Sequence, residues 1–292
     1  MNKEKIIQAG KILSEVREYT QKFIKKDMPL LEIAEKIEEK IFKLGGKPSF
    51  PTGLCINDIA AHYTPSHDDK TLAKGLLKID IGAHIDGWIA DTAFSIDLEN
   101  NKENKELIES SEKALENVME KIKKNIQIRE IGEIVQKTIE SSGFSPIINL
   151  SGHQVEKYDL HAGISIPNFD NGNENLLPKG LYAIEPFSTS GNGKVYDGKP
   201  SGIYQLISEK NIRNPIARQV LELIKKEYQT LPFCSRWIVK KFGTKALIGL
   251  KQLEENKNLH HYAVLVETSH KNVAQTEHTI LIEDKEIIVT TK

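Results

Sequence analysis

The feature that most constrains the fold of this chain is an internal repeat. The segment EIAEKIEEKIFKLGGKP (32–48) aligns with EIGEIVQKTIESSGFSP (130–146) at an offset of 98 residues. A second match, KGLLKIDI (74–81) with KGLYAIEPF (179–187), has an offset of 105 residues. Repeated units of this kind form equivalent supersecondary structures. Each half is therefore predicted to be a helix pair followed by antiparallel strands, with an approximate two-fold relation between the halves.

Two helices are predicted in each half. Pro29 suits the first turn of a helix, and Gly45 and Gly143 suit positions just after helix ends. The four helices are expected at residues 3–25, 29–44, 102–124 and 129–142. The fold class is thus α+β, because the segments after each pair alternate in the manner of strands.

The segment KIDIGAHIDGWIADTAFSID (78–97) is predicted to form a β-hairpin. Asp86 and Gly87 make the preferred dipeptide for a two-residue type I′ turn, because both central residues of that turn need positive φ. The turn pairs Ile85 with Trp88, and this pairing sets the register of the two strands.

Two acids lie inside the apolar arms of that hairpin, where a carboxylate is costly to bury. The register places Asp80 and Asp91 on one face as diagonal neighbours, with Gly82 opposite Asp91 and leaving space beside it. His84 shares the face but lies near the turn, and we expect it to be structural. Two converging carboxylates repel each other unless a cation lies between them. The alternative is a pair of solvated acids on an edge hairpin.

The second half is predicted to contribute an equivalent pair of acids. The repeat aligns Asp80 with Glu185, and the alternating segment NVAQTEHTILIE (272–283) offers Glu277 as the mate of Glu185. The 92 residues that separate these two glutamates imply an insertion in the second hairpin. We expect a single domain over 1–292 that carries a helical insertion at 195–258.

Four acids on inner strands favour a metal site, and a site of oxygen ligands with one imidazole suits Mn, Fe, Co or Zn, often as a pair. The segment SGHQVEKYDLH (151–161) contains His153 and His161. At the repeat offset, His161 falls one position from the match of His62. One imidazole on each side of a cleft is consistent with function, although a structural role is the alternative for a lone histidine.

Composition excludes several other functions. Forty Lys and Arg residues against 41 Asp and Glu give a net charge of −1, so no nucleic-acid binding of its own is expected. No stretch approaches 18 apolar residues, so no membrane association is expected. The two cysteines, Cys55 and Cys234, have no metal-binding spacing, and we expect free thiols in a cytoplasmic protein.

The chain resembles the type II methionine aminopeptidases, in their archaeal form, of the pita-bread metallopeptidase family. The resemblance extends from about residue 3 to 290. It rests on five motifs: FPTGLCINDIAAHYTP (50–65), KIDIGAHIDGWIADTAFS (78–95), SGHQVEKYDLHAG (151–163), AIEPF (183–187) and AQTEHTIL (274–281). The insertion between the last two motifs is a mark of type II.

The resemblance implies two divalent metal ions, with Co, Mn, Fe and Zn as the candidates. Asp91 and Glu277 would bridge the two ions. Asp80 would bind one ion, and His153 with Glu185 would bind the other. In that scheme the two carboxylates of the first hairpin face each other because the metal pair lies between them.

The resemblance also implies catalytic roles. A hydroxide that bridges the two ions would be the nucleophile, and Glu185 would carry its proton to the leaving amine. His161 would stabilise the oxyanion, and His62 would contact the amide after the first residue of the substrate. Phe50, Leu160 and Tyr262 match positions that wall the methionine pocket, with ordinary core packing as the alternative.

The implied activity is removal of the initiator methionine from nascent polypeptides when the second residue is small, near the ribosome and as a monomer. Two alternatives share the fold. One is an Xaa-Pro dipeptidase, although such enzymes usually carry an additional N-terminal domain. The other is a non-catalytic pita-bread binding protein, although such proteins have lost metal ligands that this chain keeps.

Overall fold

A computed structural model describes residues 1–292 and contains seven helices. These are α1 (Lys3–Phe23), α2 (Leu30–Lys43), α3 (Lys102–Lys121), α4 (Ile128–Ser141), α5 (Pro215–Glu227), α6 (Ser235–Phe242) and α7 (Ala246–Glu255). The first four confirm the two predicted helix pairs, with ends within three residues of the predicted ones. One detail was wrong: Pro29 is the N-cap residue of α2 and does not lie in its first turn.

The helix ends show the repeat directly. Gly45 and Gly143 follow α2 and α4 with φ of +86° and +82°, a conformation that glycine adopts at little cost. Asn2 and Asn101 cap α1 and α3, and each side-chain oxygen accepts a hydrogen bond from a backbone N–H in the first turn. Equivalent helices thus begin and end with equivalent chemistry in both halves.

The strands form the central layer of the molecule, and the helices cover it. They are β1 (Lys47–Pro48), β2 (Gly53–Ile56), β3 (Ile59–Ala61), β4 (Leu76–Ile85), β5 (Trp88–Asp97), β6 (Ser145–Pro146), β7 (Ser151–Val155), β8 (Ser165–Pro167), β9 (Gly180–Ile184), β10 (Phe187–Thr189), β11 (Val195–Leu206), β12 (Phe233–Cys234), β13 (Leu259–Glu267), β14 (Val273–Gln275), β15 (His278–Ile282) and β16 (Ile287–Val289). Their four sheets have the orders β1–β4–β2 with β5 on β4, β14–β10–β6, β12–β11–β13–β3 and β16–β15–β9–β7–β8. The mixture of helices and antiparallel strands confirms the α+β class.

The predicted hairpin of the first half is β4 and β5. Ile85 pairs with Trp88 across the turn, and the ladder continues to the far ends of both strands. Asp86 and Gly87 have φ of +50° and +84°, as the type I′ turn requires. The predicted register is therefore confirmed: Gly82 lies opposite Asp91.

The corresponding strands of the second half are interrupted. We predicted one strand over 272–283, but it is divided into β14 and β15, and its partner is divided into β9 and β10. The break in the partner has a chemical reason, since Pro186 has no N–H to donate to a ladder. The pairs Ile184–His278 and Phe187–Gln275 both sum to 462. Since 185 and 277 also sum to 462, Glu185 and Glu277 lie opposite each other across the gap.

The two halves meet where β5 runs beside β14 and β15. The backbone N–H of Glu277 donates to the Ala93 carbonyl at 2.9 Å. Thr279 Oγ1 accepts from the Asp91 N–H and donates to the Asp91 carbonyl, both at 2.7 Å. Thr92 Oγ1 donates to the Glu277 carbonyl at 2.8 Å. Hydroxyl groups thus complete the ladder between the halves and fix Asp91 next to Glu277.

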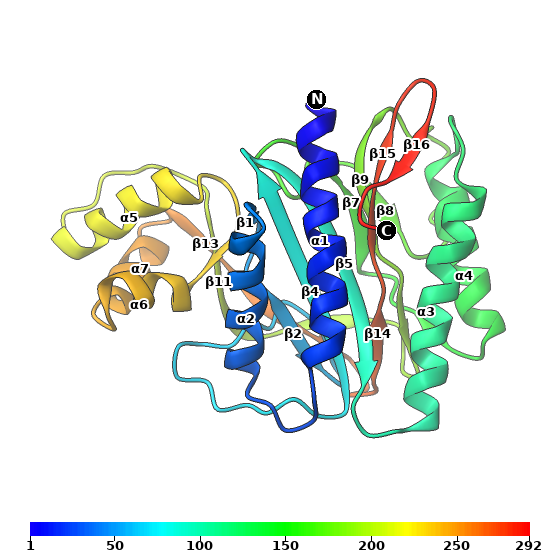
Figure 1. Cartoon of the computed structure of the whole chain (residues 1–292), viewed down its shortest axis with the longest axis horizontal. Coiled ribbons are helices and arrows are strands. Elements are labelled where there is room, and N and C mark those ends of the chain that lie inside the picture. The colour runs from blue at the N-terminus through cyan, green and yellow to red at the C-terminus, as the bar shows by residue number, and fades with distance from the viewer.

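Each half has its own apolar core. Helices α1 and α2 lie over β4 and β5, as Figure 1 shows, and 19 buried residues fill the interface. A second core of 14 buried residues lies between α3 with α4 and the β9–β15 pair. Burial of these apolar faces is the main favourable contribution to folding. The acids lie between the two cores.

Helices α5, α6 and α7 stand to one side of the molecule in Figure 1, beyond β11 and β13. They share a core of 12 buried residues with the adjoining strands. The predicted helical insertion began at residue 195, but residues 195–206 form strand β11, and the helices occupy 215–255. None of the helices combines the length and apolarity needed to cross a bilayer.

Candidate metal centre and peptide pocket

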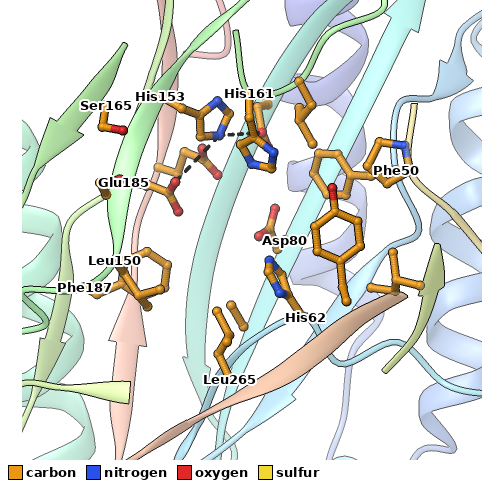
Figure 2. A pocket seen from close by; sticks show the side chains of 18 of the residues that line it. Phe50, His62, Asp80, Leu150, His153, His161, Ser165, Glu185, Phe187 and Leu265 are labelled. Atoms are coloured by element: carbon orange, nitrogen blue, oxygen red, sulfur yellow. Dashed lines mark ion pairs between the residues drawn. The ribbon is translucent and has the colours of Figure 1, made fainter. Parts of the chain in front are cut away.

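One pocket of about 380 Å³ brings together all ten residues to which the sequence analysis assigned a role. They are Phe50, His62, Asp80, Asp91, His153, Leu160, His161, Glu185, Tyr262 and Glu277. Figure 2 shows Asp80, Glu185, His153, His161 and His62 converging on the same space. Residues up to 227 positions apart in the sequence therefore share one site.

The four acids and one imidazole come from the strands that the repeat generates. Asp80 lies on β4 and Asp91 on β5. Glu185 directly follows β9, and Glu277 directly precedes β15. His153 lies on β7, paired with Ala183 of β9, which sets it beside Glu185. Two hairpins, related by the repeat, thus present their acids to a common centre.

Burial and the charges of neighbouring acids both disfavour the ionised forms of these carboxyl groups. Burial raises the pKa of Asp80 to about 7. Burial first, and then the charge of Asp80, raise the pKa of Asp91 and Glu185 well above the ordinary range. The pKa of Glu277 is raised in the same way, by burial and then by Asp91. Carboxylates arranged in this way cannot all ionise unless a cation compensates them.

Several buried polar atoms of the acids and of His153 lack a hydrogen-bond partner, as expected for atoms that would bind a cation. Asp80 Oδ1, Asp91 Oδ1 and His153 Nδ1 are buried without a hydrogen-bond partner. His153 Nε2 lies 3.7 Å from a Glu185 oxygen and 3.8 Å from an Asp91 oxygen, too far for hydrogen bonds.

A set of ligand atoms is nevertheless close together. One atom each from Asp91, His153 and Glu277 lies within 4.8 Å of the others. Carboxylate oxygens with one imidazole nitrogen are ligands that Mn, Fe, Co and Zn accept. The residues present therefore fit a divalent cation, and binding one would satisfy the atoms that the protein leaves unpaired.

Gln275 is a site residue that the sequence analysis missed. Its Nε2 lies 3.3 Å from one oxygen of Asp80 and 3.3 Å from one oxygen of Glu185, donating to both. It is the only side chain that donates a hydrogen bond to either acid. Its place in the AQTEH motif, two residues before Glu277, was the signal that could have identified it.

His62 is held in an unusual conformation. Its φ is +62°, in the left-handed region that a histidine occupies at a cost, and such residues cluster at functional sites. Its Nδ1 lies 3.2 Å from the Ala263 carbonyl. Since a carbonyl only accepts, Nδ1 carries the proton and Nε2 keeps its lone pair. Burial lowers the pKa of His62 to about 4, so the neutral ring persists at physiological pH.

His161 lies against His153 but makes no hydrogen bond to it. Its ring centroid is 4.4 Å from that of His153, in an edge-to-face arrangement. No side chain or backbone group of the protein hydrogen-bonds its ring nitrogens, and burial lowers its pKa. A neutral imidazole with a free N–H can therefore reach a group bound in the pocket.

Apolar side chains close one side of the pocket. Tyr262 stacks edge-on against His62 at 5.3 Å, and its hydroxyl donates to Gln205 at 2.8 Å. The expected open space beside Gly82 is absent, because a Cβ there would lie 2.2 Å from the Phe50 ring. The glycine thus gives room for Phe50 rather than for solvent. Leu160 completes this apolar side.

Twelve further residues line the pocket without having been predicted. They are Pro51, Ala61, Asn149, Leu150, Ser151, Gly163, Ile164, Ser165, Phe187, Ile203, Pro232 and Leu265. Several lie inside the motifs named above, so their place in the sequence pointed to them. No motif marked Pro232, which lies within the insertion between α5 and α6, or Leu265, which follows the insertion on β13. The other histidines, including His84 and His278, do not line the pocket, as expected.

Comparison with known proteins agrees with this geometry. The model of metallopeptidase family M24 matches residues 4–284. The methionine aminopeptidase of Methanocaldococcus jannaschii is 45% identical over 292 residues, which cover 99% of this chain and 98% of that protein.

Solved structures agree on the fold. A thermophilic Arx1 superposes with a TM-score of 0.84 at 17% identity, covering 98% of this chain and 89% of that one. The methionine aminopeptidase of Thermotoga maritima gives a TM-score of 0.71 at 22% identity, covering 100% and 98%.

The chain belongs to metallopeptidase family M24, a family of metal-dependent hydrolases with the pita-bread fold. Within that family, it is similar over nearly its whole length to archaeal methionine aminopeptidases. The resemblance inferred from the motifs is thereby confirmed, as is the use of divalent metal.

Proposed function

We propose that this protein removes the N-terminal methionine from peptides and nascent polypeptides whose second residue is small. The observation that carries the proposal is the pocket itself, where four carboxyl groups and an imidazole lie together with apolar side chains. The similarity to a methionine aminopeptidase over 99% of the chain supports the same activity.

We propose that two divalent ions bind between the two hairpins. Asp91 and Glu277 would bridge them, Asp80 would hold one, and His153 with Glu185 would hold the other. The unpaired oxygens of Asp80 and Asp91 support this assignment. When bound, the ions supply Lewis acidity, which polarises the scissile carbonyl and lowers the pKa of water to near neutrality.

The residues around that centre would move the protons. Glu185 would accept a proton from water and deliver it to the departing amine, a general acid–base role. The 3.3 Å hydrogen bond from Gln275 would orient its carboxylate. His161 would donate to the carbonyl oxygen as negative charge develops there.

His62 would position the substrate by accepting a hydrogen bond. Because its Nδ1–H is committed to Ala263, the Nε2 lone pair is free to accept the N–H of the amide after the first residue. The methionine side chain would lie against Phe50, Leu160 and Tyr262. A crowded site next to His62 would favour small second residues.

The remaining expectations concern where and with what the protein works. We propose that it acts as a monomer in the cytoplasm, on chains emerging near the ribosome. The buried, unpaired Cys55 and Cys234 support a reducing compartment.

Peptide cleavage tests the proposal. Met-Gly-Xaa peptides should be cleaved faster than Met-Lys and Met-Trp peptides, and Leu-Gly peptides should be poor substrates. Chelation should stop cleavage, and added Mn, Fe, Co or Zn should restore it. Preferential cleavage of Xaa-Pro peptides would favour the dipeptidase alternative. Absence of any cleavage with every metal would favour a binding protein.

A further inference from the structure

A second cavity, of about 400 Å³, lies between the first half of the molecule and the helices of the insertion. Its walls come from α2, from the end of β4 near the hairpin turn, and from α5 and α6. Residues of each wall include Phe42, His84, Leu223 and Trp237. The volume falls in the range of about 300–1,000 Å³ found for small-molecule sites. No residue of the peptide pocket lines it.

His84 contributes an uncommitted hydrogen-bond donor to this cavity. The side chain is only 5% exposed, and its Nδ1 accepts a hydrogen bond from the Gly87 N–H at 3.0 Å. Since that contact requires a lone pair on Nδ1, the proton of the neutral ring is on Nε2. Burial lowers the pKa of His84 to about 4, which keeps the ring neutral. Nε2 has no partner in the protein.

Three ammonium groups stand around the same cavity. Lys47 and Lys240 have only loose, exposed contacts, at 3.7 Å to Glu227 and 3.4 Å to Glu35. Lys241 has no acidic partner. Exposed pairs of this kind contribute little and are easily exchanged for another anion.

The acid in the wall does not compete for these donors. The Glu38 carboxylate accepts hydrogen bonds from both terminal nitrogens of Arg236, at 2.7 and 2.8 Å, and from the Trp237 indole N–H at 2.8 Å. Both carboxylate oxygens are thus committed. The cavity therefore has free donors and cations but no free carboxylate apart from the rim residue Glu227.

Aromatic rings provide a flat apolar surface beside these donors. Tyr228 stacks on Trp237 with ring centroids 5.5 Å apart and an interplanar angle of 29°. Leu223, Leu231 and Phe42 extend that surface, and Phe42 is 57% exposed. A planar apolar group would be favourable here, because it would remove this surface from water.

We propose that this cavity is a second ligand site, which binds a small organic anion with a planar aromatic body. The anionic group would accept from His84 Nε2 and lie among Lys47, Lys240 and Lys241. The aromatic body would pack on Trp237 and Tyr228. This assignment goes beyond the proposed peptidase activity and does not depend on it.

The second site is separated from the peptide pocket by thin walls. Pro48 lines the second cavity, whereas Phe50 lines the peptide pocket. Leu231 and Pro232, adjacent in the chain, are divided between the two in the same way. The two cavities thus share no lining residue, and competition between ligands distinguishes one from the other.

Fluorescence titration of the full chain with 1-anilinonaphthalene-8-sulfonate tests the proposal. The matched neutral probe is N-phenyl-1-naphthylamine, which has the same aromatic body without the sulfonate. One equivalent of the anionic probe should bind, at least about tenfold more tightly than the neutral one, as expected for charge-assisted hydrogen bonds.

Two variants locate the binding. Lys240→Gln with Lys241→Gln should weaken binding of the anionic probe about tenfold or more. His84→Asn should also weaken it, since its amide oxygen can replace Nδ1 while the Nε2 donor is lost. The control is Lys43→Gln with Lys226→Gln, which removes equal charge from α2 and α5 outside the cavity. Thermal unfolding of each variant checks that it is folded.

Three results would overturn the proposal. The first is equal weakening in the control variant, which would indicate general electrostatic attraction. The second is equally tight binding of the neutral probe. The third is displacement of the anionic probe by saturating free methionine, which would place it in the peptide pocket.

Discussion

The two halves of this molecule build the same acidic centre in different ways. In the first half, Asp80 and Asp91 are 11 residues apart, on unbroken strands joined by a two-residue turn. In the second half, Glu185 and Glu277 are 92 residues apart, and both lie at breaks between short strands. Local pairing therefore positions one pair of acids, whereas contacts between distant segments position the other.

The difference shows what the second half depends on. Its acids require the seam between β5 and β14–β15, where Thr279 and Thr92 hold Glu277 beside Asp91. The long connection between β11 and β13 carries the helices α5–α7, which form a wall of the second cavity, and the segment between α5 and α6 supplies Pro232 to the pocket. The longer connection of the second half thus adds binding surfaces that the first half does not have.

The largest expected effect follows from replacing an acid where the halves meet. Asp91→Asn should abolish activity, a loss greater than the roughly 10²–10³-fold caused by losing one oxyanion donor. The reason is that a carboxamide lacks the second anionic oxygen needed to bridge two cations. Elemental analysis of the variant should find at most one metal equivalent per chain.

The matched control is Asp86→Asn, in the turn of the same hairpin. Its side chain is exposed, and asparagine also suits the first central position of a type I′ turn. Activity and metal content should be unchanged there. Two metal equivalents in the Asp91 variant would contradict the bridging role.

The attachment of the insertion to the first half can be broken separately. Glu38→Gln should destabilise the protein by about 3–5 kcal/mol, because it leaves Arg236 buried without its counter-charge. Glu38 and Arg236 are 6% and 3% exposed, so the guanidinium that loses its partner is largely removed from solvent. Urea denaturation gives the change in the free energy of unfolding.

Glu35→Gln on the same helix is the control, because its exposed contact with Lys240 should contribute less than about 1 kcal/mol. Combining Glu38→Leu with Arg236→Met should recover much of the loss, since it removes both charges together. A Glu38 variant as stable as the wild type would show that the ion pair does not hold the insertion in place.

Much of this comparison could be predicted from the sequence. The Asp86–Gly87 turn determined the hairpin register, which then placed Asp80 and Asp91 on one face. The repeat extended that result to Glu185, and alternation extended it to Glu277. All four acids line the pocket. Asp80 and Asp91 share a face because period-2 alternation and a two-residue turn leave little freedom in the register of their hairpin.

The sequence was less informative where distant segments meet. The predicted insertion, 195–258, was given a start inside strand β11. This strand is stabilised by pairing with β13, and its own sequence shows no strand pattern that would have marked it. The role of Gly82 was misjudged, since only the fold shows that the Phe50 ring occupies the space beside it. His62, whose φ is positive, likewise contacts Ala263, 201 residues away, and no local sequence pattern marks that contact.

The two histidines that the repeat relates should differ in function. His161→Ala should lower kcat by roughly 10²–10³-fold, about 2.7–4 kcal/mol, with little change in KM, as expected for a donor that acts in the transition state. His62→Ala should change both kcat and KM, because it also positions the bound substrate. Steady-state kinetics with a Met-Gly-Xaa peptide separates the two.

Metal content should be normal in both variants, since neither histidine is a proposed ligand. Loss of an ion in either would mean that the imidazoles were assigned wrongly. Near-wild-type kcat in the His161 variant would remove its oxyanion role.

The smallest expected effect concerns the relative stability of the first half and the insertion. Burial raises the pKa of Cys55, on β2, and of Cys234, on β12, to about 12. At pH 8 almost no thiolate forms in the folded state, whereas an unfolded thiol of pKa about 8.5 reacts readily. Because the pKa of each thiol is higher in the folded state than in the unfolded state, protonated thiols contribute to the free energy of unfolding. That contribution is fully present below about pH 8.5 and is lost as the pH rises toward 12. Labelling at pH 8 therefore requires opening of the surrounding structure.

The two thiols should open at different rates. Cys55 lies on a strand covered by the 19-residue core of the first half, whereas Cys234 adjoins the 12-residue core of the insertion. Regions with smaller cores open at lower free energy. In the single-thiol variants Cys55→Ala and Cys234→Ala, Ellman's reagent at pH 8 should therefore label Cys234 faster than Cys55. Equal rates would mean that both thiols are exposed only by global unfolding, and that the insertion is as firmly held as the hairpin half to which Glu38 and Arg236 attach it.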